Sequence, residues 1–129
     1  MNENELVEKY LEELISSSDL DDENAYYNLI DFRGDSKVTE YLMIRFNQSE
    51  DRSLKNEIIN LLVYFQDSLT LDFFGKLLYS EYWKYSLDAL VGMGNKQALE
   101  KLEELNLTLS PAKEKWVAEA IEQIKEANK

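Results

Sequence analysis

The sequence predicts an all-α protein made of repeated helix pairs, and three observations support this prediction. Nearly every segment between turn signals has apolar residues at the helical spacing, and none has the sustained alternation that marks a strand. The connections between these segments are short and polar, as expected between neighbouring helices. Three of the connections have a similar order of residues and recur about one helix pair apart, which is typical of helical repeat proteins.

The length and composition are those of a globular protein, and we expect a single domain over residues 1–129. Hydrophobic residues make up 44% of the sequence, enough apolar surface to offset the entropy lost on folding. No apolar run approaches the ~20 residues of a membrane span. The first residues, MNENELVEKY, lack the basic and apolar regions of a signal peptide, and the chain has no cysteine. These features predict a cytoplasmic protein without disulfides.

Eight helices are expected along the chain, each from its own apolar stripe. Their ranges are about 3–16, 22–32, 37–47, 53–65, 68–79, 81–92, 95–105 and 111–126. In the first half the stripes include Leu6, Tyr10 and Leu14, with Val7 and Leu11 as further candidates; Tyr26, Leu29 and Ile30; Val38 and Leu42, with Tyr41 and Phe46 as further candidates; and Leu54, Ile58, Leu61, Leu62 and Phe65. In the second half they include Leu69, Phe73, Leu77 and Leu78, followed by Trp83, Leu87 and Leu90. These stripes are the expected core.

Short polar residues mark where some of these helices begin. After the break at SSSDLDD, Asp21 or Asp22 is expected to cap the second helix. Ser110 suits the N-cap of the last helix, because Pro111 then occupies its first position, where a missing N–H group costs nothing.

Three joints between helices share one pattern, an apolar helix end, a short turn and a new stripe. They lie in LIDFRGDSKVTEYL (29–42), LVYFQDSLTLDFF (62–74) and LVGMGNKQALEKL (90–102). Asp35, Asp67 and Asn95 occupy the same point of these joints, where their side chains can accept hydrogen bonds from the first N–H groups of the next helix. Gly34 and Gly94 precede two of them and suit the left-handed conformation that ends a helix.

The third joint, LDALVGMGNKQALEKLEEL, resembles the short HEAT-like repeat of the bilin-lyase type, whose pattern is roughly A-L-x-x-L-G-D-x-x-A-x-x-x-L. The matching positions are Ala89, Leu90, Met93, Gly94, Asn95, Ala98 and Leu102. The first joint keeps the glycine–acid pair, whereas the second has Gln66 where the pattern has glycine, and WVAEAIEQI (116–124) resembles the second helix of a final repeat.

This resemblance implies a right-handed α–α superhelix, a HEAT-like solenoid of about four helix pairs. The pairs would cover 3–32, 36–65, 68–92 and 95–126. A scaffold of this kind presents a surface for binding and implies no chemistry by itself.

The net charge of −12 is the strongest feature of the composition. It argues against binding nucleic acid or an anionic membrane, since both require clustered Lys and Arg. The charge is uneven, because residues 1–23 contain nine acids and one lysine and so contribute −8. Two interpretations stay open at this point: the acids keep the protein soluble, or they steer it toward a basic protein partner.

The residue types argue against catalysis. The chain has no histidine and no cysteine, which excludes Ser/His/Asp and Cys/His arrangements. Ser110 and Lys113 have the Ser-x-x-Lys spacing of a lysine-activated serine, but this spacing also fits a helix cap followed by a solvated lysine. We therefore expect no enzyme, no catalytic residue and no cofactor.

One acidic segment has the spacing of a metal loop only at its start. Asp19, Asp21 and Glu23 alternate like the first ligands of a calcium-binding loop. The sixth position would then be Asn24 in place of glycine, and the twelfth Ile30 in place of a bidentate glutamate. The segment is therefore expected to cap a helix, and no metal site is predicted.

The second helix of each pair carries residues that fall outside the buried stripes and that should line one face of a solenoid. Asn28 is one of them, and the candidate partner-binding site consists of Asp31, Asn56, Ile59, Val63, Tyr85, Asp88, Glu119 and Glu122. Acids would then flank an apolar and aromatic centre, as in many protein interfaces. The alternative is that Ile59 and Val63 pack under a neighbouring helix and that Tyr85 is a scattered surface aromatic.

Two functional hypotheses follow. The first is a non-enzymatic protein-binding module for a basic partner; by analogy of size and charge, it would be an immunity protein or antitoxin that neutralises a basic toxin. The second is a ligand-handling or lyase-like helper protein with HEAT-like repeats, which would need a concave apolar pocket with convergent polar groups. The oligomeric state is left open.

Overall fold

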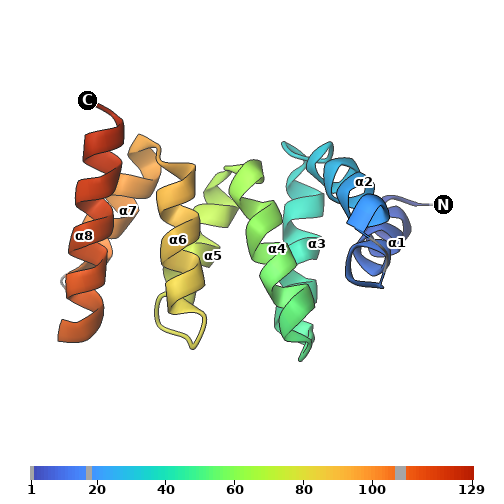
Figure 1. Cartoon of the computed structure of the whole chain (residues 1–129), viewed down its shortest axis with the longest axis horizontal. Helices are drawn as coiled ribbons and strands as arrows, with labels where there is room; N and C mark the ends of the chain where they lie inside the picture. Colours follow the sequence, from blue (N-terminus) through green and yellow to red (C-terminus); the bar gives the residue numbers. More distant parts are fainter. Residues whose placement is uncertain (1, 17–18, 107–109) are drawn as a thin grey trace. The chain divides into compact units, whose positions relative to one another are not determined.

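The computed structural model describes residues 2–16, 19–106 and 110–129, and within these ranges the protein is all-helical without strands, which confirms the predicted class (Figure 1). The helices are α1 (Glu3–Ser16), α2 (Asp19–Ile30), α3 (Ser36–Gln48), α4 (Arg52–Phe65), α5 (Ser68–Leu77), α6 (Trp83–Met93), α7 (Lys96–Asn106) and α8 (Pro111–Ala127). No helix in this part of the chain has the length and apolar character needed to cross a membrane.

Most helix ends lie close to the predicted positions, and α2 differs most at its start. It begins at Asp19, so the prediction that Asp21 or Asp22 caps it is wrong, because both residues lie inside the helix. The segment DLDDEN contains no glycine or proline, and acidic residues are favourable in a first helical turn. The side chains of residues 19–23, where the rejected calcium loop would begin, lie outside the described part of the structure.

The three joints share a backbone feature, a residue with positive φ immediately before the Asp or Asn. Gly34 has φ 92° and Gly94 has φ 58°, as expected for glycines at helix ends. Gln66, where the repeat pattern has glycine, adopts φ 49° all the same and ends α4. The left-handed conformation therefore occurs at all three joints, including the one where the sequence lacks glycine.

The capping side chains at two of the joints are confirmed. Asp35 accepts from the backbone N–H groups of Lys37 and Val38 at the start of α3, and Asn95 accepts from that of Ala98 in α7. Ser110 occupies the N-cap position of α8, with Pro111 as the first helical residue, but no side-chain hydrogen bond caps the helix there.

Contacts divide the chain into two compact units, residues 1–69 (unit 1) and 70–129 (unit 2), and the expectation of a single domain stays a prediction. In unit 1, α1 packs against α2, α3 against α4, and α4 also contacts α1 and α2 (Figure 1). The buried side chains there include Val7, Leu11, Leu29, Leu42 and Leu61. This packing brings the start of α1 close to the turn between α2 and α3.

In unit 2, α6, α7 and α8 pack against one another. Their buried side chains include Leu90, Leu102, Val117 and Ile124. The fully buried hydroxyl of Ser86 in α6 donates a 2.6 Å hydrogen bond to the carbonyl oxygen of Phe74, which joins α5 to the same core.

Candidate protein-binding groove

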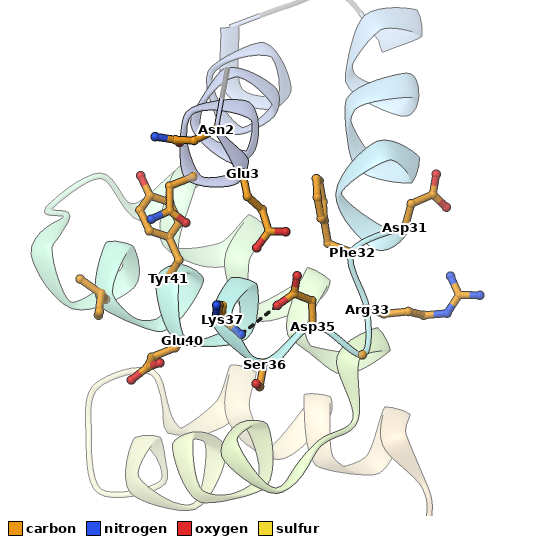
Figure 2. Close-up of a pocket in the computed structure, with 13 residues that line it drawn as sticks. Asn2, Glu3, Asp31, Phe32, Arg33, Asp35, Ser36, Lys37, Glu40 and Tyr41 are labelled. Carbon is orange, nitrogen blue, oxygen red and sulfur yellow. Dashed lines mark hydrogen bonds between the residues drawn. The ribbon is translucent and has the colours of Figure 1, made fainter.

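An open groove of about 1120 Å³ lies in unit 1, between the first turn of α1, the turn after α2 and the first two turns of α3 (Figure 2). Its lining consists of Asn2, Glu3, Asn4, Asp31, Phe32, Arg33, Gly34, Asp35, Ser36, Lys37, Glu40, Tyr41 and Ile44. The groove is open along its length, as a surface that receives an extended segment or a protruding loop would be.

The turn between α2 and α3 determines where the groove's central carboxylate lies. Phe32, Arg33 and Asp35 close the turn with backbone hydrogen bonds to Leu29, Ile30 and Phe32, respectively. Gly34 takes the positive φ that this path needs, and Asp35 then caps α3. The carboxyl group of Asp35 is therefore held in the groove by the same bonds that start the helix.

Two carboxyl groups meet at this point. Glu3 of α1 and Asp35 point toward one another in Figure 2. Hydrogen bonding to Asp35 is the main cause that raises the pKa of Glu3 above its ordinary value; burial and the negative charge of Asp35 act in the same direction, and Lys37 opposes them. The two groups repel when both are ionised, so an incoming cation would relieve this repulsion.

A second cluster holds α1 against α3 beside the groove. Glu8 of α1 accepts a 2.7 Å hydrogen bond from the hydroxyl of Tyr41 and pairs with the guanidinium of Arg45 through Nε, both residues lying in α3. Burial and the bond to Glu8 raise the pKa of Tyr41 to about 12, and the bond to Glu8 raises that of Arg45. The phenol of Tyr41 is thus neutral at ordinary pH, and its bond to Glu8 holds it in place at the side of the groove.

The groove combines acidic and apolar groups. Four of its side chains are acids (Glu3, Asp31, Asp35 and Glu40), two are bases (Arg33 and Lys37), and Phe32, Tyr41 and Ile44 supply apolar surface. Ile44 is exposed over 47% of its surface. Arg33 points away from the Glu3 and Asp35 carboxyl groups in Figure 2, and its side chain forms no hydrogen bond or ion pair with another described residue.

The net charge is concentrated in the unit that contains the groove. Residues 1–69 contain sixteen Asp and Glu against six Lys and Arg, and residues 70–129 contain ten against eight. Unit 1 therefore carries −10 of the net charge of −12, and unit 2 carries −2. The field of unit 1 attracts cations toward the groove.

The residues of the predicted partner-binding face lie in both units. Asp31 (α2 end), Asn56, Ile59 and Val63 (α4) belong to unit 1, whereas Tyr85 and Asp88 (α6) and Glu119 and Glu122 (α8) belong to unit 2. Within either unit, no side-chain hydrogen bond or ion pair joins any two of these eight residues, all of which are described. A continuous face made of all eight stays a prediction, and Asp31 alone among them lines the groove.

Exposure separates these eight residues further. Asp31, Tyr85, Asp88, Glu119 and Glu122 are exposed as predicted, and Asn56 and Val63 are half-buried. The outward placement of Ile59 is wrong, because its side chain is only 2% exposed. Apolar residues cover more than one side of α4, so the stripe through Leu54 and Ile58 is only part of the buried surface of this helix.

The other groove residues escaped the sequence analysis for physical reasons. Glu3 appeared as one of many solvated acids, and its pairing with Asp35 depends on how α1 packs in unit 1. Ile44 is an apolar residue outside the apolar stripe of α3, and this position is the signal in the sequence that could have drawn attention to it.

Within the described residues, no group of His, Cys, Asp or Glu is arranged to hold a metal ion. Comparison with protein-family models and with curated proteins finds no match to this chain. The interpretation of the groove therefore depends on its own residues.

Proposed function

We propose that the chain is a non-enzymatic protein-binding module whose acidic unit 1 captures a basic protein partner through the groove. The observation that carries this proposal is the pairing of Glu3 with Asp35 inside a groove that also exposes apolar surface at Ile44. Crowded carboxylates favour a Lys or Arg side chain from outside, and the adjoining apolar surface gives the contact area that an interface needs.

Charge also supports a basic partner over other ligands. The net charge of −10 on unit 1 repels nucleic acid and anionic lipid, and it accelerates the approach of a positively charged protein. An immunity protein or antitoxin that covers a basic toxin is the biological role that best matches this chemistry. The HEAT-like solenoid remains part of this proposal as the scaffold that presents the groove.

The first experiment measures binding of an oligolysine peptide to the full chain by calorimetry as the ionic strength is raised. Between about 10 mM and about 1 M salt the Debye length falls from about 30 Å to about 3 Å. We expect the dissociation constant to rise at least about ten-fold over this range. An oligoglutamate peptide of the same length is the control and should not bind.

The second experiment separates the groove from the overall charge. Glu3→Gln with Glu40→Gln removes two charges from the groove, and Glu13→Gln with Glu50→Gln removes two from elsewhere in unit 1. We expect the first pair to weaken oligolysine binding about five-fold or more, and the second pair less than about two-fold. Equal effects of the two pairs would show that overall charge, and not the groove, binds the peptide.

A further inference from the structure

We propose that a tyrosine patch on unit 1, formed by Tyr26, Tyr27 and Tyr64, receives arginine side chains of the basic partner beside the groove. This inference rests on the proposed function and names the side chain that the partner must supply. It concerns residues of α2 and α4 that do not line the groove.

The patch is an exposed aromatic cluster. Tyr26 lies edge-to-face with Tyr27, with ring centroids 6.4 Å apart, and with Tyr64, with centroids 6.0 Å apart. Tyr27 and Tyr64 are exposed over 58% and 50% of their surfaces. Tyrosine is a frequent anchor in protein interfaces, because a large rigid ring loses little conformational entropy on binding.

Among the described residues, no Lys or Arg lies over the rings of the patch. The ring contacts of the three tyrosines are those within the patch. The contrast with unit 2 is informative, because there Lys84 lies 5.4 Å and 5.3 Å from the ring centroids of Trp83 and Trp116. The exposed surfaces of the Tyr27 and Tyr64 rings are therefore accessible to a cation from another molecule.

One carboxylate, that of Glu57, acts on the patch. Burial raises the pKa of Tyr26, and Tyr64 and the negative charge of Glu57 raise it further, so Glu57 lies within electrostatic reach of the rings. A planar guanidinium can stack its flat face on a tyrosine ring, whereas an ammonium is more strongly hydrated and has no flat face. This combination favours arginine over lysine.

The patch is also continuous with the groove along α2. The backbone N–H of Asp31, a groove residue, bonds to the carbonyl oxygen of Tyr27, so the two residues occupy successive turns of one helix face. A partner segment that places one cation in the groove can thus place its next one over Tyr27.

The test uses the full chain and a capped peptide of alternating glycine and arginine. Two matched peptides replace each arginine by lysine or by citrulline, which keeps the shape of arginine without its charge. Affinity is measured by calorimetry, and ring contact is measured by the NMR shifts of the tyrosine ring protons. We expect the arginine peptide to bind about five-fold tighter than the lysine peptide, with ring-proton shifts confined to the patch, and the citrulline peptide not to bind.

Two double variants test the aromatic ring and the phenolic hydroxyl separately. Tyr27→Leu with Tyr64→Leu removes the aromatic faces, and we expect about ten-fold weaker binding of the arginine peptide. Tyr27→Phe with Tyr64→Phe keeps the faces and should stay within about two-fold of the parent. Circular dichroism checks that both variants keep their helices.

The outcomes distinguish this inference from the proposed function. The inference about the patch is wrong if the Tyr27→Leu, Tyr64→Leu variant binds the arginine peptide as tightly as the parent. If the Glu3→Gln, Glu40→Gln variant then binds this peptide more weakly than the parent, the proposed function of the groove is still supported. If neither the arginine nor the lysine peptide binds at low salt, the proposed function fails and the patch fails with it.

Discussion

The hydroxyl of Thr39, in the first turn of α3, donates a 2.8 Å hydrogen bond to Oδ2 of Asp67, in the turn that follows α4. Thr39 is fully buried, and its hydroxyl also lies 3.3 Å from the carbonyl oxygen of Asp35. The Asp of the second joint therefore ties the end of one helix pair to its beginning. Asp67, a candidate cap by its position in the joint, thus also links α3 to the turn after α4.

We expect Thr39→Val to destabilise unit 1 by about 1–2 kcal/mol, because it keeps the shape of the side chain and removes the donor to a charged group. Urea denaturation followed by circular dichroism measures the change. Thr39→Ser keeps the hydroxyl and removes the buried methyl group, so it measures the cost of the methyl group separately. A Val variant as stable as the parent would contradict a role for the hydrogen bond.

Gln66→Gly should stabilise the protein by about 1 kcal/mol, because glycine adopts the φ of 49° at this joint without the steric cost that a β-carbon brings. The measurement is the shift of the urea midpoint at constant slope. Gly94→Ala is the opposite test and should be destabilising, since its β-carbon would lie 3.2 Å from the carbonyl oxygen of Val91. A destabilising Gln66→Gly would mean that the glutamine side chain has a role beyond its backbone conformation.

The Glu8–Tyr41 bond predicts a dependence of stability on alkaline pH. The pKa of Tyr41 is raised to about 12 in the folded protein, and that of an unfolded tyrosine is about 10. The neutral phenol is favoured by folding, so its contribution is fully present below about pH 10 and is lost as the pH rises toward 12. Tyrosinate absorbance should show late ionisation that Tyr41→Phe reduces by the amplitude of one tyrosine and that Glu8→Gln moves in part to lower pH. Tyr26, whose pKa is also raised, keeps its own late step in both variants. An unchanged late amplitude in the Tyr41→Phe variant would contradict the assignment to Tyr41.

Ser86→Ala should destabilise unit 2 by about 1 kcal/mol through loss of the buried bond to Phe74. The cost stays small because the carbonyl oxygen of Phe74 also accepts from the backbone N–H of Leu78. Both tryptophans of the chain lie in unit 2, so their fluorescence follows the unfolding of that unit. Gln97→Ala, an exposed change on α7, is the control and should leave the fluorescence transition unchanged.

The features that the sequence predicted well are local ones. Asp35 and Asn95 cap helices, and Gly34 and Gly94 take positive φ, because these roles depend on residues within one turn of each other. The start of α2 was missed because acids favour the first turn of a helix as well as the cap that precedes it, so DLDDE is compatible with both. Ile59 was misplaced because periodicity identifies an apolar side of a helix without saying how many neighbours the helix has.

The sequence by itself determined the all-α class, the joints and the acidity of unit 1, since helical periodicity, capping and charge are properties of neighbouring residues or of composition. Only the tertiary structure decided which of the many acids would meet. Glu3 faces Asp35, and Tyr64 joins Tyr26, because helix packing brings distant turns together, and no local pattern encodes that proximity. The candidate groove and the tyrosine patch are consequences of this packing.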